Sequence, residues 1–448
     1  MIPCAVIRLL FMHLPSYIQR LTNLFLFLLP WQTIWIYKEA QINGVKWQYG
    51  TQGFYATEML AWIIVLLFLC HYVSLIKKKE YIREKKTKWD RLFVGTGCLF
   101  FIYLFATSFV APFPDVVEQY IVRMMLVFIL FILFSTKVID FSRATLWLIA
   151  GSIPAGILGI WQFLSQTTVA SSFFGLASHP AAEAGTSIIA FEGERWLRAY
   201  GPMAHPNIFG GYLFLIVAVC FYYWFVAHTS RISFRFSRMY ETVTLIAALL
   251  GSSALFFTFS RSSWIGVAIL WVGTFFLFIK QRIGVRFHMV LLIPVIILSS
   301  IYVPLVTSRL GIASSHEQQS IDERVSGVVE AKSIIRDHLW LGTGAGNYTA
   351  AVYRLDKWRP GWEYQPVHST PILLFAEIGV VGSTLLFLWI VSFFFLYKDV
   401  LLRARLFVFS VFIGISPLLF LDHYLYTSYL GLVLFALLIS TSLRPLNT

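Results

Sequence analysis

Two arginine-containing motifs carry side chains suited to binding an anion. Arg198 lies in the segment 195–207, which leads directly into an apolar run. Arg261 lies in the polar segment 260–263, which interrupts a much longer apolar run. A guanidinium matches the geometry of phosphate and keeps its charge at any working pH, and a helix N-terminus adds free N–H groups. The motifs predict a phosphate or pyrophosphate site with Arg198 and Arg261 as donors and Arg195 as a weaker one.

Two further segments carry groups that could exchange protons. His368 precedes an apolar run, and a histidine there either accepts a proton from a hydroxyl or is an ordinary hydrogen-bonded loop residue. Glu377 lies about 13 Å further along that run, and an ionisable residue inside a membrane span is a functional candidate. Asp422 and His423 end another apolar run, where they either join the site or belong to the membrane interface.

Other residues are interpreted as support for these groups. Asn207 either caps the helix that begins there or contributes to the site, together with His205 just before it. Gly344 lies in the glycine-rich segment 342–348, which resembles a nucleotide-binding loop only in spacing, since no strand–helix unit surrounds it. A turn that lets backbones approach closely is the better interpretation. Arg324 is a weaker candidate for anion binding.

The elements that must position these groups are membrane-spanning helices. Of 448 residues, 58% are hydrophobic and 13% are charged, whereas a soluble domain has about 25% charged residues. This composition excludes a soluble enzyme or nucleic-acid-binding protein. The four cysteines show no CxxC spacing, so neither a disulfide framework nor a zinc site is expected.

The apolar runs predict an all-α polytopic membrane protein forming a single domain over residues 1–448. Each span needs about 20 apolar residues. We predict twelve spans, at 21–37, 57–76, 92–111, 119–135, 144–165, 207–227, 240–258, 263–279, 288–304, 369–397, 406–421 and 428–443.

Charge predicts the orientation of these spans. With the N-terminus in the cytoplasm, the short inner segments and the two termini hold 22 of the 35 Lys and Arg residues, as the positive-inside rule requires. Both termini are therefore expected inside. The net charge of +13 is interpreted as topology and not as nucleic-acid binding. The long loop 305–368 is expected outside, between spans nine and ten, with a helix over 320–336 on the membrane surface.

Taken together, these motifs resemble the O-antigen ligase and polymerase family of bacterial membrane glycosyltransferases, most clearly over residues 195–440. The family often has Asn after the histidine where this chain has Ser369. The motifs that carry the resemblance are 198–207 (RAYGPMAHPN), 260–264 (SRSSW), 342–348 (GTGAGNY) and 368–382 (HSTPILLFAEIGVVG).

The resemblance implies a multi-helix glycosyltransferase fold and a metal-independent, inverting transfer without a cofactor or nucleotide sugar. The donor would be a glycan on undecaprenyl pyrophosphate, and the acceptor a hydroxyl of a glycan, lipid or protein at the outer face of the bacterial cytoplasmic membrane. Arg198 and Arg261 would hold the pyrophosphate, and His368 would be the general base. The resemblance does not separate polymerase from ligase.

Two other functions fit a polytopic membrane protein. A flippase for lipid-linked oligosaccharides would place its polar groups near the membrane midplane, whereas here they gather at one predicted surface. A peptidoglycan glycosyltransferase of the cell-shape and division type would need a catalytic carboxylate in the long outer loop, where Asp322 and Glu323 are the candidates.

Overall fold

The structure is a computed structural model that describes residues 4–77, 88–229, 238–278, 282–311, 315–396 and 402–443. These residues form a bundle of long helices. Its long helices are α1 (Cys4–Leu28), α2 (Ala56–Lys77), α3 (Lys88–Ser108), α4 (Pro114–Ser135), α5 (Phe141–Ser165), α6 (Pro206–Thr229), α7 (Arg238–Thr258), α8 (Arg261–Phe278), α9 (Arg282–Ile301), α13 (Thr370–Leu396), α14 (Leu402–Leu421) and α16 (Tyr429–Leu443).

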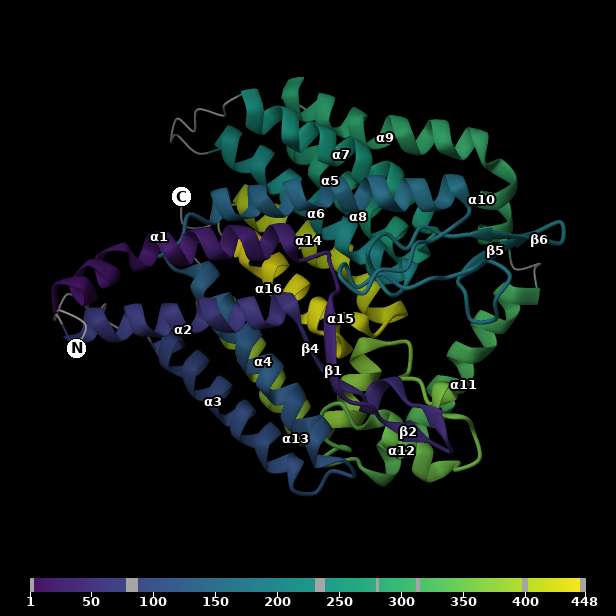
Figure 1. The fold of residues 1–448 in the computed structure, drawn as a ribbon, viewed down its shortest axis with the longest axis horizontal. Helices are drawn as coiled ribbons and strands as arrows, with labels where there is room; N and C mark the ends of the chain where they lie inside the picture. The colour runs from purple at the N-terminus through teal and green to yellow at the C-terminus, as the bar shows by residue number, and fades with distance from the viewer. Residues whose placement is uncertain are drawn as a thin grey trace.

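Shorter elements join these helices. The termini lie near one end of the long axis, and α10, α11 and the β5–β6 hairpin lie at the other (Figure 1). The other helices are α10 (Val303–Leu310), α11 (Ser315–Asp337), α12 (Tyr348–Leu355), α15 (Tyr424–Thr427) and the 3-10 turns η1 (Gln48–Gly50) and η2 (Gly361–Glu363). Three antiparallel pairs join β1 (Ile34–Lys38) to β4 (Gln52–Tyr55), β2 (Gln41–Ile42) to β3 (Val45–Lys46) and β5 (Ile188–Phe191) to β6 (Glu194–Leu197).

The prediction of an all-α polytopic membrane protein is confirmed. Among the described residues, seven helices are long and apolar enough to cross a membrane, and α9 with α10 forms an eighth apolar segment bent by 94°. The apolar stretches in α8, α14 and α16 are shorter. The total of twelve spans and their orientation stay predictions. The seven helices are Ala56–Ile76, Arg91–Ser108, Pro114–Ser135, Phe141–Ser165, Pro206–Tyr223, Tyr240–Phe257 and Thr370–Phe395.

The first predicted span was wrong in its position. A span over 21–37 was expected, but α1 ends at Leu28 and Ile34–Lys38 is strand β1. Pro30 follows the helix end and disfavours continued helix, while the β-branched and aromatic residues of β1 pair with β4. The prediction from hydrophobicity alone therefore combined the end of a helix and a strand into one span.

Two local predictions are confirmed. The polar break at 260–263 separates α7 from α8, with Phe259 in the left-handed conformation (φ 47°) at the turn. The helix expected over 320–336 lies within α11. The turn is tighter than predicted, because Arg261 is already the first residue of α8.

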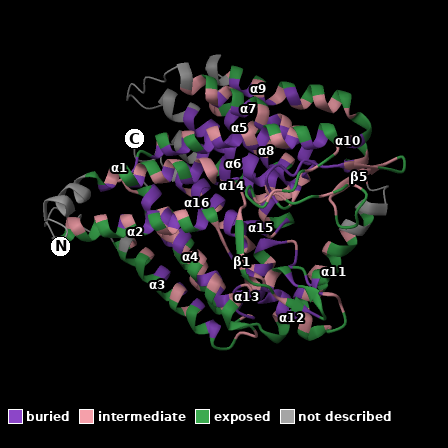
Figure 2. Ribbon diagram, viewed as in Figure 1, coloured by how far each residue is buried: buried purple, intermediate pink, exposed green. Residues whose placement is uncertain are grey.

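The helices pack around two hydrophobic cores. The larger core joins α1, α2, the C-terminal half of α4, α5–α10, α14 and α16, and the smaller joins α3, the N-terminal half of α4 and α11–α13. Buried residues concentrate on α6, whose membrane segment is 94% buried (Figure 2). The short helix α15 belongs to both cores, since Tyr424 and Leu425 pack in the larger and Tyr426 in the smaller. The two cores therefore meet at α15, as they also do along α4.

Helix α13 is broken at Gly379, and residues 339–344, which lead into the glycine-rich segment, bond to the backbone on both sides of the break. Gly379 has φ 59° and ψ −169°, a conformation reserved for glycine. The amides of Val380 and Val381 donate to the carbonyls of Leu339 and Trp340, outside the helix. A Cβ at Gly379 would lie 2.5 Å from the Trp340 carbonyl oxygen. The break thus lets the chain before α12 bond to the middle of a span.

Gly379→Ala should lower the stability of the fold. A side chain would combine unfavourable backbone angles with a clash against Trp340, at a cost of about 1–3 kcal/mol or more. Thermal unfolding of the purified protein in detergent measures the effect. Gly95→Ala on α3 is the control, because no atom lies within 4 Å of its added Cβ. Equal melting temperatures for the two variants would contradict the role of Gly379.

Candidate active site

Arg198 ties the segment after β6 to the end of α7. Its side chain is buried, with 4% of the residue exposed. Its Nε donates to the carbonyl of Thr258 at 2.7 Å, and one Nη donates to Oδ1 of Asn207 at 2.7 Å. The guanidinium therefore lies between the C-terminus of α7 and the first turn of α6.

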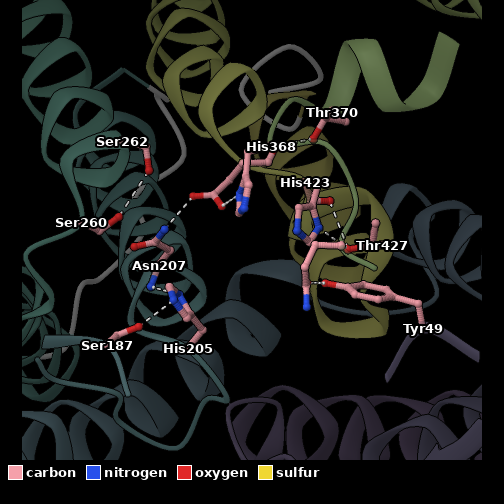
Figure 3. Close-up of polar contacts among 12 residues, drawn as sticks. Tyr49, Ser187, His205, Asn207, Ser260, Ser262, His368, Thr370, His423 and Thr427 are labelled. Atoms are coloured by element: carbon pink, nitrogen blue, oxygen red, sulfur yellow. Dashed lines mark hydrogen bonds and ion pairs between the residues drawn. The ribbon is translucent and has the colours of Figure 1, made fainter. Parts of the chain in front are cut away.

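Asn207 and Asp422 continue this contact toward His368 (Figure 3). Nδ2 of Asn207 donates to Oδ2 of Asp422 at 3.0 Å. The other carboxylate oxygen of Asp422 lies 3.6 Å from Nδ1 of His368. Four side chains that the sequence proposed separately thus form one chain of contacts, from Arg198 at one end to His368 at the other.

Asp422 also positions the start of α13 through its backbone. Its carbonyl accepts hydrogen bonds from the amide (3.1 Å) and the hydroxyl (2.9 Å) of Thr370. Ser369 directly precedes the helix and is buried. His368 is therefore held just ahead of a helix whose first residue is bonded to the same aspartate.

The environment of Asp422 keeps its carboxylate charged. Burial alone would raise the pKa, but the neighbouring His368, with His423 and His205 adding to its effect, lowers the pKa below the usual value. An ionised carboxylate beside Nδ1 stabilises the imidazolium that forms when His368 takes up a proton.

His368 has a geometry suited to proton transfer. Its Nδ1 is buried and faces Asp422, while the side chain as a whole is 35% exposed. The exposed part of the ring therefore lies away from Nδ1. Nε2 is the ring nitrogen that a hydroxyl can reach, so this arrangement can accept a proton from an alcohol.

Arg261 and its serines lie beside the first turn of α6. The hydroxyl of Ser260 lies 3.3 Å from that of Ser262 and 3.1 Å from that of Ser263. A Cβ added to Gly210 would lie 2.5 Å from the Ser263 hydroxyl, so α8 approaches α6 one turn after Asn207. Half-buried Arg261 therefore begins α8 near the group formed by Arg198 and Asn207.

A second glycine lets α15 approach the same turn of α6. A Cβ at Gly211 would lie 2.0 Å from the hydroxyl oxygen of Tyr424. Gly210 and Gly211 thus admit α8 on one side and the segment 422–424 on the other. Close approach without a side chain is what brings the arginine motif and Asp422 together at α6.

His205 supports this arrangement as a neutral side chain. Its Nδ1 accepts a hydrogen bond from the amide of Asn207 at 3.1 Å, so its Nε2 carries the proton and donates to the Ser187 hydroxyl at 2.8 Å. Burial, reinforced by the charge of Arg198, lowers the pKa of His205 to about 3. With both nitrogens engaged, His205 orients the start of α6.

His423 is also a supporting residue. Its ring lies 5.2 Å from that of His368, and its Nδ1 lies 2.9 Å from the hydroxyl of Thr427. Burial and the nearby His368 lower its pKa to about 3, although Asp422 opposes the shift. His423 therefore packs against His368 as a neutral side chain at neutral pH.

Other residues predicted for the site have their described contacts elsewhere. Arg195 donates to the carbonyls of Ala181 (2.5 Å) and Glu183 (3.1 Å) and so braces the loop before β5. Arg324 is half-buried on α11. Asp322 and Glu323 are exposed on the same helix, where Asp322 accepts from Gln318 at 3.0 Å. The contacts that join Arg198 to His368 include none of these four.

Glu377 and Gly344 have architectural contacts. The carboxylate of Glu377 accepts from the amides of Gly346 (2.7 Å) and Tyr348 (3.2 Å) and from the Tyr426 hydroxyl (2.8 Å). Gly344 has φ +90° and donates to the Glu377 carbonyl at 2.9 Å. Glu377 therefore organises the glycine-rich segment, as the turn interpretation of that segment predicts.

The sequence did not identify Arg309, which lies at the same turn as Arg198. Nε of Arg309 donates to the carbonyl of Phe259 at 2.9 Å, next to the Thr258 carbonyl that Arg198 binds. Arg309 reaches this point because α10 folds back at 94° to α9. Its sequence signal is a basic residue in a largely apolar stretch. That signal was missed because residue 309 was predicted to lie in the long loop 305–368.

A buried ion pair was also missed. Arg123 on α4 binds both carboxylate oxygens of Glu58 on α2, at 3.0 and 3.1 Å, and the carbonyl of Gly53 at 2.6 Å. Each residue is the only Asp, Glu, Lys or Arg within its predicted span, 57–76 or 119–135, which is a usable signal for pairing. The pair joins α2 and α4.

Part of the chain that contributes to this site is similar to a known protein family. Residues 246–388 match a family model described as O-Antigen ligase. No curated protein matches the chain. The matched segment includes Arg261 and His368, whereas Arg198, Asn207 and Asp422 lie outside it. The match supports the resemblance inferred from the motifs, over residues 246–388.

Gly211→Ala should destabilise the junction of α6 and α15. The methyl group would displace the Tyr424 ring, and overpacking of this kind costs about 1–3 kcal/mol. Thermal unfolding should show a lower melting temperature than Gly251→Ala, whose Cβ meets its nearest atom at 4.0 Å. Adding Tyr424→Phe to Gly211→Ala removes the closest atom and should restore part of the loss. No difference between the two alanine variants would contradict this packing.

Stability should fall as the pH falls below about 6.5, in part through His205. Its pKa is lower in the folded chain, so the unfolded chain binds a proton that the folded chain excludes between pH 6.5 and about 3. The melting temperature of His205→Gln should therefore depend less on pH between 7.5 and 5 than that of the wild type. Exposed His338→Gln is the control. Identical pH profiles for wild type and His205→Gln would show that His205 is not held neutral.

Proposed function

We propose that this integral membrane protein, which carries an O-antigen ligase domain, transfers a glycan from undecaprenyl pyrophosphate to an acceptor hydroxyl. The observation that carries the proposal is the chain of contacts Arg198–Asn207–Asp422–His368, with the Arg261 turn beside it. One site thus combines the permanent positive charge of the arginines, which binds an anion, with a histidine that can accept a proton. These are the two functions that the transfer requires.

The donor end of the proposed reaction is the arginine group. When the bond between the anomeric carbon and pyrophosphate breaks, its electron pair passes to a pyrophosphate oxygen and negative charge develops there. Arg198 and Arg261 offset that charge without a proton transfer, and the α8 N-terminus adds amide dipoles. Preorganisation by the Thr258 carbonyl and Asn207 limits the reorganisation that Arg198 must undergo.

The acceptor end is His368. Its Nε2 takes the proton of the acceptor hydroxyl as the oxygen attacks the anomeric carbon from the face opposite the pyrophosphate. The configuration at that carbon is inverted by this route. Asp422 holds the ring through Nδ1 and stabilises the imidazolium until the proton passes to solvent.

Location follows from the same proposal. The site lies at the end of the helices that the distribution of Lys and Arg predicts to be outside, so transfer occurs at the outer face of the bacterial cytoplasmic membrane. Polymerisation and ligation differ in the acceptor alone. A second lipid-linked repeat as acceptor makes the protein a polymerase, and a lipid, protein or other wall component makes it a ligase.

Reconstituted protein should release undecaprenyl pyrophosphate from the lipid-linked glycan that accumulates in source cells lacking the protein. His368→Ala removes the general base and should reduce kcat about 100-fold or more. Arg261→Ala should reduce turnover by a similar factor through lost charge stabilisation. Release of the carrier and growth or transfer of the glycan are measured together by mass spectrometry.

Matched controls are exposed residues of the same types. His338 lies in the turn directly after α11 and Arg354 lies on α12, and His338→Ala and Arg354→Ala should retain full turnover. Full turnover by His368→Ala and Arg261→Ala would overturn the assignment. Movement of the lipid-linked glycan across proteoliposomes without any transfer would instead support a transporter.

A further inference from the structure

Five of the six Trp and Tyr residues of the segment 305–368 separate into two groups in the structure. Tyr348 and Tyr364 are buried, with 1% and 0% exposed. Trp340, Trp358 and Trp362 are 66%, 94% and 61% exposed. Trp358 and Trp362 lie four residues apart on the turn between α12 and α13, residues 356–365, which we call the tryptophan turn. Two large apolar side chains on one short turn mark a surface for interaction.

The tryptophan turn is held firmly from inside. The Arg359 guanidinium bonds to Glu330 on α11 at 2.6 Å and to Asp356 at 2.9 Å. The hydroxyl of buried Tyr364 donates to the Asp356 carbonyl at 2.8 Å and accepts from the Arg359 amide at 3.1 Å. These bonds fix the backbone on both sides of Trp358.

A second element braces the turn from the N-terminal part of the chain. Nδ2 of Asn43, at the tip of the β2–β3 hairpin, donates to the carbonyls of Lys357 (2.6 Å) and Arg359 (2.8 Å). Gly361 packs so closely on this hairpin that an added Cβ would lie 2.6 Å from the Val45 carbonyl oxygen. The two tryptophans are therefore exposed on a turn whose backbone is well ordered.

Continuous contacts lead from the tryptophan turn to the candidate active site. The carbonyl of Trp362 accepts from Nε2 of Gln365 at 2.6 Å, and Oε1 of Gln365 accepts from the Tyr49 hydroxyl at 3.0 Å. The Tyr49 ring lies 6.0 Å from the ring of His423, which neighbours His368 (Figure 3). Trp362 precedes His368 by six residues, which span at most about 20 Å.

We propose that Trp358 and Trp362 form a binding platform for the acceptor glycan, which extends from the hydroxyl at His368. The inference rests on the proposed function and adds the place where the acceptor is held. The C–H groups of a sugar ring carry slight positive charge and pack on the negative face of an indole. Because the turn is ordered beforehand, little conformational entropy is lost when a glycan binds.

The position of the turn favours a glycan over the membrane interface as its partner. Tryptophans that anchor a protein in the interface lie at the ends of spanning helices. Trp358 and Trp362 lie on a segment between α12 and α13, and α13 begins eight residues after Trp362, at Thr370. Exposed Lys357 and Glu363 flank the two indoles, which suits a polar ligand in water.

Kinetics of the reconstituted protein test the platform. With the accumulated lipid-linked glycan as donor, Trp358→Ala/Trp362→Ala should raise the KM for the acceptor at least about fivefold, because two ring contacts are lost. The KM for the donor and kcat at saturating acceptor should not change. Trp358→Phe/Trp362→Phe should recover most of the affinity. Trp340→Ala, an equally exposed tryptophan outside the turn, is the matched control.

A binding measurement separates this inference from the proposed function. The probe is the free glycan released by mild acid from the accumulated carrier and titrated by calorimetry. Binding to wild type with loss in the double alanine variant supports the platform even if no transfer occurs. Unchanged acceptor KM and unchanged glycan binding in that variant would overturn it while transfer itself stands. Glycan binding that stays intact in the double variant, together with a smaller fraction of tryptophan fluorescence quenched by brominated lipids than in wild type, would show that the turn is a membrane anchor.

Discussion

The structure depends on a charged carboxylate placed where two hydrophobic cores meet. Asp422 is almost fully buried, so its charge has to be compensated by nearby donors and cations. Asn207 from α6 and His368 from the start of α13 approach its two oxygens, and Thr370 bonds to its carbonyl. Each of these contacts joins elements far apart in the chain. The contacts that compensate this buried aspartate therefore position the arginine side and the histidine side of the site relative to each other.

Close packing of small residues makes that placement possible. Gly210 and Gly211 form adjacent positions on α6 against which α8 and α15 rest. Because α6 is enclosed on nearly all sides, its first turn is a fixed reference for the arginine motif and for Asp422. The break at Gly379 has a comparable effect in the smaller core, where it seats the segment before α12. Rigid placement of this kind is what a charge-stabilising site requires, since mobile donors would lose their advantage over water.

Residues of the same type proved to have different tasks. Arg198 and Arg195 lie three residues apart, yet one contacts Asn207 and the other braces a loop through backbone carbonyls. Of the ionisable residues that end or enter spans, Asp422 joins the candidate site while Glu377 binds backbone amides of the glycine-rich segment. Spacing along a sequence places such residues near a membrane surface. It does not say which partner each one meets, because the partners come from other elements of the chain, 9 residues away for Arg198 and Asn207 and 215 residues away for Asn207 and Asp422.

The sequence by itself determined the class of protein, most of the apolar helices, the polar break before α8 and a resemblance to the O-antigen ligase family, three of whose four motifs lie in the matched residues 246–388. These follow from composition and local periodicity, which reflect the solvent that each segment meets. Only the tertiary structure decided that Asp422 and Asn207 connect Arg198 to His368, that Arg309 reaches the same turn, and that β1 replaces the end of the first predicted span. Those facts depend on contacts between distant segments, and hydropathy contains no information about them.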